Sequence, residues 1–116
     1  ALNNLAAIEL TGNKSPAKAE PLARRAVEAA TESANYRDTL AEILAARGEF
    51  AKALAEQQQA VRLEPGNPMY LARAGQLQAR LGQKDAAVAS LSRALEMSDS
   101  FPGAADAKKQ LATLKR

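Results

Sequence analysis

Small and apolar side chains recur along this chain at a fixed interval of about 34 residues. The sets that share a phase are Ala19, Ala53 and Ala87; Ala26, Ala60 and Ala94; Val27, Val61 and Leu95; and Gly48 and Gly82. A fixed period of this length is typical of stacked repeat proteins, in which each unit is one supersecondary element that buries its apolar face against its neighbours. The pattern therefore predicts a solenoid, and a function in recognition rather than in catalysis.

Within each unit the apolar residues follow the three-to-four-residue spacing of amphipathic helices. Seven helices are expected: from Leu2, from Pro16 toward Ala30, after the connection Ser33–Tyr36, around Ala53–Leu63, from Pro68, from Asp85, and from Phe101-Pro102 to Lys115. Three units of this period followed by one terminal helix account for the whole chain.

Several residues at the expected boundaries favour helix starts. Asn67 followed by Pro68 is typical of an N-cap and a first helical residue, and Asp85 is expected to cap the sixth helix. Pro21 falls inside the second helix, where a proline loses a backbone hydrogen bond and clashes with the preceding turn. We therefore expect an irregular first turn there, or a helix that begins near Glu20.

The composition agrees with an all-α chain and limits its chemistry. There are 28 alanines against three valines and two isoleucines, a balance that favours helix over strand. Cysteine and histidine are both absent, which removes thiolate chemistry, the commonest general base and the commonest neutral metal ligand. We expect no cofactor, no metal site and no enzymatic activity.

Residues that occupy equivalent positions in the second and third units form a recognisable pattern. In residues 34–67 they are Leu40, Ala41, Gly48, Phe50, Ala53, Ala60 and Pro65; in residues 68–101 they are Ala74, Gly75, Gly82, Ala87 and Ala94. The chain resembles the tetratricopeptide repeat (TPR) family over essentially its whole length. The resemblance implies a single domain over residues 1–116, a right-handed α–α superhelix with repeats at about 1–33, 34–67 and 68–101, and a C-terminal capping helix at about 102–116.

A second resemblance concerns the source. Asn3-Asn4-Leu5-Ala6, Arg37-Asp38-Thr39-Leu40 and the Phe101-Pro102 helix resemble the C-terminal repeats of large bacterial TPR proteins of the envelope and exopolysaccharide-export type. Because the chain begins at Ala1 within a helical pattern, we expect it to be a fragment of a longer, bacterial protein. A targeting signal would lie outside the fragment, which leaves both the cytoplasm and the periplasm open. No apolar stretch approaches the roughly 18 residues of a membrane helix, so no membrane insertion is expected.

The family resemblance implies that the first helix of each unit lines a concave groove that binds a peptide or a partner helix. Helical phase selects the following groove residues: Asn3 and Ala7; Asp38 and Glu42; and Met69, Arg73, Gln76 and Arg80. The groove should be acidic in its middle and basic toward the third unit. Alternatively these charges only form a solvated face, with Glu42 paired to Arg73 or Gln76 across adjacent helices.

Other functions are less well supported by the sequence. Family members that bind chaperone tails clamp a terminal carboxylate with basic and amide side chains, whereas the matching positions here include Asp38, Glu42 and Met69, so we do not expect that ligand. The basic residues Lys108, Lys109, Lys115 and Arg116 suit a helix C-terminus, and aromatic stacking platforms for nucleic acid are nearly absent. The main hypothesis is a protein-interaction scaffold. The alternative is a structural spacer or a module that self-associates through exposed solenoid ends.

Overall fold

The computed structural model describes residues 16–29 and 33–116, and this part of the chain contains only helices, turns and loops. The helices are α2 (Pro16–Ala29), α3 (Ala34–Ala46), α4 (Phe50–Leu63), α5 (Pro68–Arg80), α6 (Lys84–Met97) and α7 (Ala104–Leu114). The all-α prediction is therefore confirmed for the described residues. The helix expected from Leu2, with Asn3 and Ala7, lies outside them.

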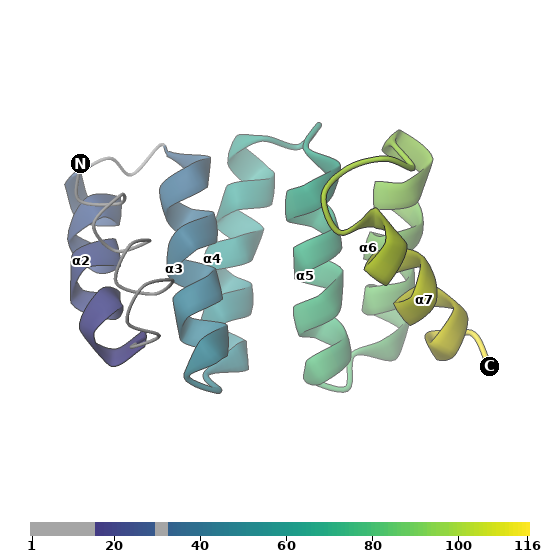
Figure 1. Ribbon diagram of the computed structural model, residues 1–116, viewed down its shortest axis with the longest axis horizontal. Coiled ribbons are helices and arrows are strands. Elements are labelled where there is room, and N and C mark those ends of the chain that lie inside the picture. The colour runs from purple at the N-terminus through teal and green to yellow at the C-terminus, as the bar shows by residue number, and fades with distance from the viewer. Residues whose placement is uncertain (1–15, 30–32) are drawn as a thin grey trace.

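Consecutive helices pack against one another in chain order, from α2 through α7. Helices α3 and α4 form one antiparallel pair within residues 34–67, and α5 and α6 form the next pair within residues 68–101. Figure 1 shows α3, α5 and α7 toward the viewer, with α4 and α6 behind them. The helices α3, α5 and α7 thus form one layer, and α7 follows the second pair in the place that the first helix of a further pair would take.

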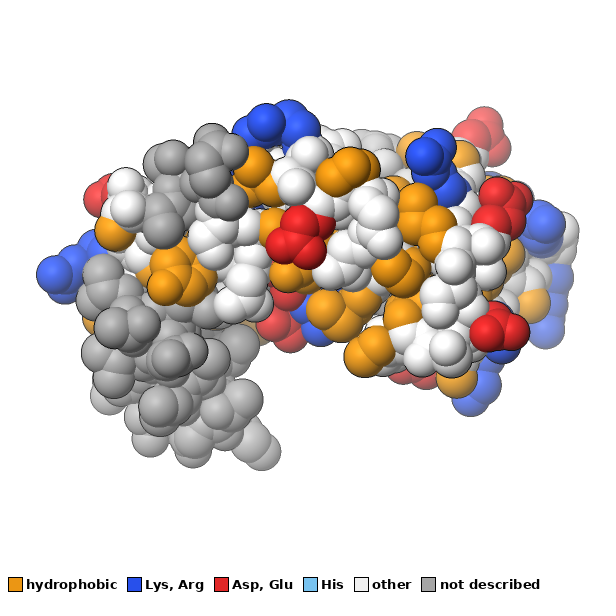
Figure 2. All heavy atoms as spheres, turned by 90° about the horizontal axis from the view of Figure 1, so that it is seen from above, with side chains coloured by type: hydrophobic (Ala, Val, Ile, Leu, Met, Phe, Trp, Pro, Cys, Tyr) orange, Lys and Arg blue, Asp and Glu red, His pale blue; other side chains and the backbone are white. Residues whose placement is uncertain are grey.

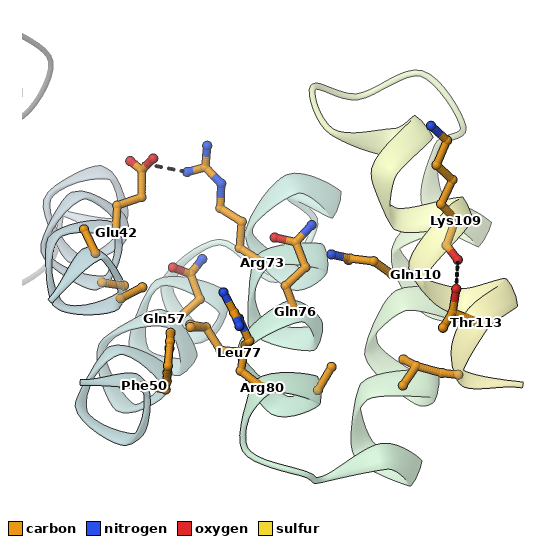
Figure 3. A pocket seen from close by; sticks show the side chains of 15 residues that line it. Glu42, Phe50, Gln57, Arg73, Gln76, Leu77, Arg80, Lys109, Gln110 and Thr113 are labelled. Carbon is orange, nitrogen blue, oxygen red and sulfur yellow. Dashed lines mark hydrogen bonds and ion pairs between the residues drawn. The ribbon is translucent and has the colours of Figure 1, made fainter. Parts of the chain in front are cut away.

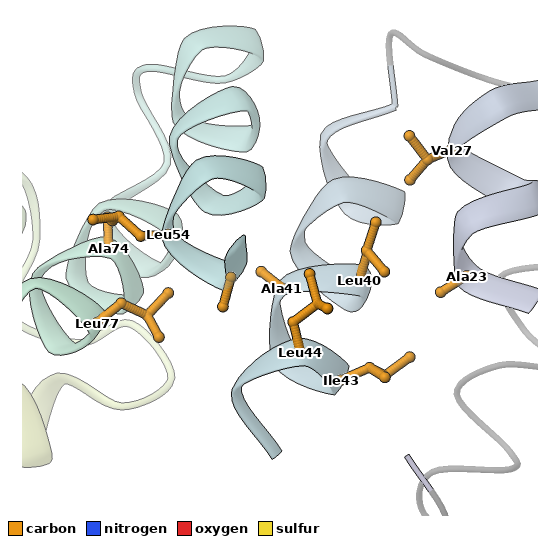
Figure 4. Packing of buried hydrophobic residues seen from close by; sticks show 10 residues of the cluster. Ala23, Val27, Leu40, Ala41, Ile43, Leu44, Leu54, Ala74 and Leu77 are labelled. Atoms are coloured by element: carbon orange, nitrogen blue, oxygen red, sulfur yellow. The ribbon is translucent and has the colours of Figure 1, made fainter. Parts of the chain in front are cut away.

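The core between α2, α3, α4 and α5 is built from interdigitating aliphatic side chains. Figure 4 shows Leu40 of α3 directed toward Val27 of α2, while Leu77 of α5 lies on the other side of α3. Leu40, Ile43 and Leu44 are each at most 1% exposed. The alanines that set the repeat period are also fully buried: Ala53, Ala60, Ala87 and Ala94. Small side chains thus stand where helices approach closely, as the sequence predicted.

Helices α5 and α6 approach each other closely at Gly75. A methyl group placed on Gly75 would lie 2.9 Å from Cγ of Leu91 and 3.2 Å from Cβ of Ser90. Leu91 is itself fully buried, so its side chain has little room to move away. The glycine therefore allows a bulky leucine to occupy the contact between the two helices.

Some of the predicted helix caps and helix ends are confirmed. The side chain of Asn67 accepts hydrogen bonds from the backbone N–H groups of Met69 (3.1 Å) and Tyr70 (3.4 Å), and Pro68 is the first helical residue. Helices α3 and α5 end just before Gly48 and Gly82, as predicted.

The starts of α2 and α3 agree only in part with the prediction. Helix α2 begins at Pro16, as predicted, and runs through Pro21, so the alternative start near Glu20 is wrong; a proline at the sixth residue removes only one hydrogen bond of the helix. Helix α3 begins at Ala34 rather than after Tyr36, because the Ser33 hydroxyl caps it by accepting a hydrogen bond from the Tyr36 N–H at 3.2 Å.

Two further predictions at the C-terminal end were wrong in detail. Gln83, without a side-chain hydrogen bond, precedes α6, so Asp85 is not its cap and instead lies in the first turn, where a carboxylate favours the helix dipole. Helix α7 begins at Ala104, not at Pro102. Gly103 adopts the left-handed conformation (φ 90°), which separates the turn at Phe101 from the helix.

Candidate functional site

A solvent-open hollow of about 790 Å³ lies between α3, α5 and α7 (Figure 3). Its floor is contributed by α4. Its lining residues are Ala41, Glu42, Ala45 and Ala46 of α3; Phe50 and Gln57 of α4; Arg73, Gln76, Leu77, Ala79 and Arg80 of α5; and Lys109, Gln110, Thr113 and Leu114 of α7. Helix α7 thus supplies one wall of the hollow.

On the α3 side of the hollow, the apolar lining residues are small. Ala45 and Ala46 of α3 project only methyl groups, and Phe50 and Leu77 provide larger apolar surface next to them. Because the alanines are small, the space above them is free, and apolar side chains of a ligand could lose contact with water there. Ligand sites in proteins commonly combine such a surface with a few convergent polar groups.

Three glutamines supply most of the uncharged polar groups. Gln57 is 1% exposed and donates a hydrogen bond from Nε2 to the backbone oxygen of Tyr70 at 3.1 Å, so its orientation is fixed. Gln76 on α5 and Gln110 on α7 are less buried, and Gln110 points toward Gln76 in Figure 3. A primary amide both donates and accepts hydrogen bonds, which matches the groups of a peptide backbone.

On the walls formed by α3 and α5, Arg73 lies beside the carboxylates of Asp38 and Glu42. The Arg73 guanidinium donates a hydrogen bond to Oδ2 of Asp38, and its Nη1 lies 3.9 Å from Oε2 of Glu42. Burial raises the pKa of Glu42 above its ordinary value, and the repulsion from Asp38 acts in the same direction, against the attraction of Arg73. Asp38 is 4% exposed and lies beneath the surface, so the expectation that it stands on an exposed helix face is wrong.

The remaining cations of the hollow have no carboxylate partner among the described residues. Arg80 lies with its guanidinium carbon 5.1 Å from the centre of the Phe50 ring, a cation–π contact, and Lys109 stands on α7. The hollow thus carries these positive charges at the C-terminal end of α5 and on α7. In its middle, Arg73 offsets only one of the two negative charges of Asp38 and Glu42, so this part remains weakly acidic.

The predicted groove residues divide into three groups. Glu42, Arg73, Gln76 and Arg80 line the hollow. Asp38 lies beneath it, and Met69 packs against the separate cluster of Ala34, Ala60 and Tyr70. Asn3 and Ala7 lie outside the described residues.

Sequence reasoning missed the contributions of α7 and α4. The wall residues of α7 follow the same period, since Gln110 lies one repeat period after Gln76, and Thr113 lies one period after Ala79. That spacing could have identified α7 as a further lining helix. Phe50 and Gln57 come from the second helix of a pair, and helical phase on the first helices alone could not select them.

The described part of the chain holds no group of three or more acidic, histidine or cysteine residues placed to bind a metal ion. Across 16–29 and 33–116, no helix has both the length and the apolar character needed to span a bilayer. On the face shown in Figure 2, cationic and anionic side chains are dispersed among hydrophobic and uncharged ones.

One segment of the sequence matches a known family. Residues 70–101 match the family model of the tetratricopeptide repeat. No curated protein matches the chain in sequence.

Solved structures match nearly the whole chain. The type III secretion chaperone SycD of Yersinia enterocolitica, in complex with a peptide of the translocator YopD, has a TM-score of 0.83 and 15% identity over 97% of this chain and 86% of its own. The Sgt2 TPR domain of Aspergillus fumigatus has a TM-score of 0.87 and 22% identity, covering 99% and 75% of the two chains. The first TPR of Spaghetti (RPAP3), bound to the HSP90 peptide SRMEEVD, has a TM-score of 0.89 and 18% identity over 98% of this chain and 87% of its own.

The fold is therefore that of stacked tetratricopeptide repeats. The chain contains a tetratricopeptide repeat at residues 70–101 and adopts the all-α superhelix of TPR proteins over its described length.

Proposed function

We propose that this chain is a non-enzymatic protein-interaction module that binds a peptide or a partner helix in the hollow between α3, α5 and α7. The observation that carries the proposal is the hollow itself, which is open to solvent, about 790 Å³ in volume, and lined by apolar, amide and charged side chains. Buried alanine and leucine side chains form most of the core elsewhere in the described repeats.

Two of the similar structures support a peptide as the ligand class. SycD was solved with a peptide of YopD, and the first TPR of Spaghetti was solved with an HSP90 peptide. Their identities to this chain are only 15% and 18%, so they support the kind of ligand and not its sequence.

The lining is also suited to a polypeptide. Apolar side chains of a ligand can be buried against Phe50 and Leu77, while the glutamines pair with its backbone. No described residue offers the histidine or cysteine on which nucleophilic or metal-assisted catalysis is commonly built, because the chain contains neither.

A substitution that fills the hollow tests the proposal. Peptides that bind the chain should first be selected from a displayed random library, and their affinities measured by fluorescence anisotropy. Gln76→Trp should abolish binding, because an indole at this position occupies the space between α5 and α7. The matched control is Gln58→Trp, which places the same ring on an exposed position of α4 that does not line the hollow.

The outcomes are distinct when both variants keep the helical circular dichroism of the parent. Loss of binding in Gln76→Trp alone supports the hollow as the binding site. Equal affinities in the two variants would place the ligand on another surface. Light scattering on the same samples tests the alternative of self-association, which requires a mass above that of the 12.3 kDa chain.

A further inference from the structure

Building on the proposed function, we infer that α7 is a movable wall of the hollow, which pivots on its first turn and closes when a ligand joins it to α5. Closure of α7 would control access to the hollow whatever the chemical class of the ligand. The way in which α7 is attached to the other helices leads to this inference.

Helix α7 lacks the polar side-chain bonds that join the other neighbouring helices. Within 16–29 and 33–116, no side chain of α7 forms a hydrogen bond or an ion pair with another helix. The bond from the Thr113 hydroxyl to the backbone oxygen of Lys109, at 3.0 Å, lies within α7 itself. Apolar contacts, which have no fixed direction, therefore hold this helix. The preceding helices are joined by the following bonds: Arg47, which follows α3, with Glu20 of α2; Arg37 of α3 with Glu56 of α4; Gln57 of α4 with the backbone of Tyr70 in α5; and Ser90 of α6 with Gln78 of α5.

The apolar contacts of α7 are concentrated at its start. Ala104 and Ala107 are the buried residues of this helix, with 6% and 0% of their surface exposed, whereas α5 has five buried residues. Leu111 and Leu114 pack against the cluster around Leu91 and are only partly buried. The first turn is therefore anchored more firmly than the C-terminal half.

The less firmly anchored half of α7 is the part that lines the hollow. Its lining residues all lie beyond Ala107 and are Lys109, Gln110, Thr113 and Leu114. Figure 1 shows the C-terminal end of α7 (yellow) directed away from α5. A helix of 11 residues is about 16 Å long. A rotation of about 15° on its first turn would therefore move the far end of this wall by about 4 Å.

The segment before α7 can serve as the pivot. Phe101 packs against the same apolar cluster as Leu111 and fixes the start of the segment. Gly103 has φ of 90°, a left-handed conformation that glycine adopts without strain, and no atom lies within 4 Å of the position that its Cβ would take. The backbone at Gly103 can therefore change its dihedral angles while Phe101 stays in place.

A ligand in the hollow would supply the connection that α7 lacks. The side chains of Gln76 on α5 and Gln110 on α7 lie on two sides of the hollow and point toward each other (Figure 3), so a polar group placed between them can bond to both. Such a group reaches both walls only when α7 is closed. Binding therefore shifts the population of the chain toward the closed arrangement.

Distances between two spin labels test the movement of α7. The chain contains no cysteine, so two introduced cysteines are labelled without competition. Gln58→Cys on α4 and Ala112→Cys on α7 place the labels at exposed positions outside the hollow. Their distance distribution, measured by double electron–electron resonance, should be broad in the free chain. It should narrow when a display-selected peptide that Gln76→Trp does not bind is added.

A second pair of labels is the matched control. Gln58→Cys with Ala86→Cys joins α4 to an exposed position of α6, and both positions lie outside the hollow. The two helices belong to the part of the chain that polar bonds hold together. The distribution of this pair should be narrow with and without the peptide.

A substitution away from the lining tests whether closure contributes to affinity. Leu111→Ala removes apolar contacts that hold α7 against the cluster, although Leu111 does not line the hollow. The closed arrangement is then less populated, so the apparent Kd of the peptide should rise by about 2–5-fold. The matched control, Leu63→Ala on α4, removes the same atoms at another partly buried position outside the hollow and should leave the Kd unchanged. Circular dichroism checks that both variants keep the helical content of the parent.

The outcomes separate the movement of α7 from the function on which it rests. A Gln58–Ala112 distribution as narrow as that of the control pair, or one that the peptide leaves unchanged, would overturn the movable wall and leave the proposed function standing. An unchanged Kd in Leu111→Ala would overturn the coupling between closure and binding. Peptides whose binding is unaffected by Gln76→Trp would overturn the proposed function itself.

Discussion

The guanidinium of Arg73 on α5 donates a hydrogen bond to the buried carboxylate of Asp38 on α3, and so joins two consecutive repeats by an ion pair beneath the hollow. The side chain of Asp38 is 5% exposed and that of Arg73 is 31% exposed. Within the described residues, the second carboxylate oxygen of Asp38 has no hydrogen-bond partner. Asp38 therefore depends on Arg73 for the compensation of its charge.

Arg73→Ala should lower the free energy of unfolding by about 2–3 kcal/mol. The loss of one partner from a fully buried pair typically costs about 3–5 kcal/mol, and the partial exposure of Arg73 reduces this value. Urea denaturation followed by circular dichroism measures the change.

The double variant Asp38→Leu/Arg73→Met is the control for this prediction. It removes both charges and keeps comparable volume, so it should recover most of the stability that Arg73→Ala loses. If the single and double variants were equally unstable, the cost would come from lost packing and not from an uncompensated charge.

The fold was predictable because its main determinant is periodic. Alanines one repeat period apart, such as Ala53 and Ala87, mark buried contacts between helices, and their phase can be read without any structure. The start of α5 was readable from its cap, Asn67, whereas the start of α3 was misread although Ser33 caps it, and that of α6 was misread where Gln83 provides no side-chain cap. A helix can begin without a cap when tertiary packing stabilises it.

The site was predictable only in part. Glu42 and Gln76 follow from helical phase, but Asp38 has the same phase and is buried, because Arg73 of the next repeat covers it. Such a contact joins residues far apart in sequence. The wall formed by α7 is signalled only by the repeat period, which places Gln110 one period after Gln76, and not by the pattern within that helix.

Glu20 should stabilise the protein in neutral solution and lose this effect in acid. Burial acts to raise its pKa, but hydrogen bonds from Arg24 (2.9 Å) and Arg47 (2.6 Å) outweigh burial and lower the pKa below 4.5. A lowered pKa gives stability that is present above pH 4.5 and is lost as the pH falls through the folded-state value. Glu20→Gln should thus cost about 0.5–1 kcal/mol at pH 7 and nothing in strong acid, since both arginines are partly exposed. Urea titrations over a pH series measure this; a constant difference at all pH values would contradict it.

Glu42 should show the opposite dependence. Burial raises its pKa above 4.5, so the stability linked to its protonated form is full below pH 4.5 and is lost as the pH rises through the folded-state value. Glu42→Gln should match the parent below pH 4.5 and exceed it at pH 7, by less than about 1 kcal/mol because the side chain is half exposed. The same pH series provides the measurement, and a less stable variant at pH 7 would show that the attraction of Arg73 prevails.

Gly75→Ala should destabilise the contact between α5 and α6. The added methyl group would lie 2.9 Å from Cγ of the buried Leu91, and overpacking typically costs about 1–3 kcal/mol. Alanine is favoured over glycine in a helix by about 1 kcal/mol, so the expected net loss is about 0–2 kcal/mol. A double-mutant cycle with Leu91→Ala isolates the clash: the combined variant should be more stable than the sum of the two single losses predicts. Additive losses would mean that α6 moves aside without cost.

Gly82→Ala should lower stability by about 1–2 kcal/mol through the backbone alone. Gly82 follows α5 with φ at 76°, a left-handed conformation that costs an L-residue about this amount, and no atom lies within 4 Å of the position its methyl group would take. Gly66→Ala is the matched control, because Gly66 has equally open space and no positive φ. It should change the free energy of unfolding by at most about 0.5 kcal/mol, or raise it slightly, since alanine restricts the unfolded chain. Thermal and urea unfolding of the two variants give the comparison, and equal losses at both positions would mean that the turn after α5 can relax into an ordinary conformation.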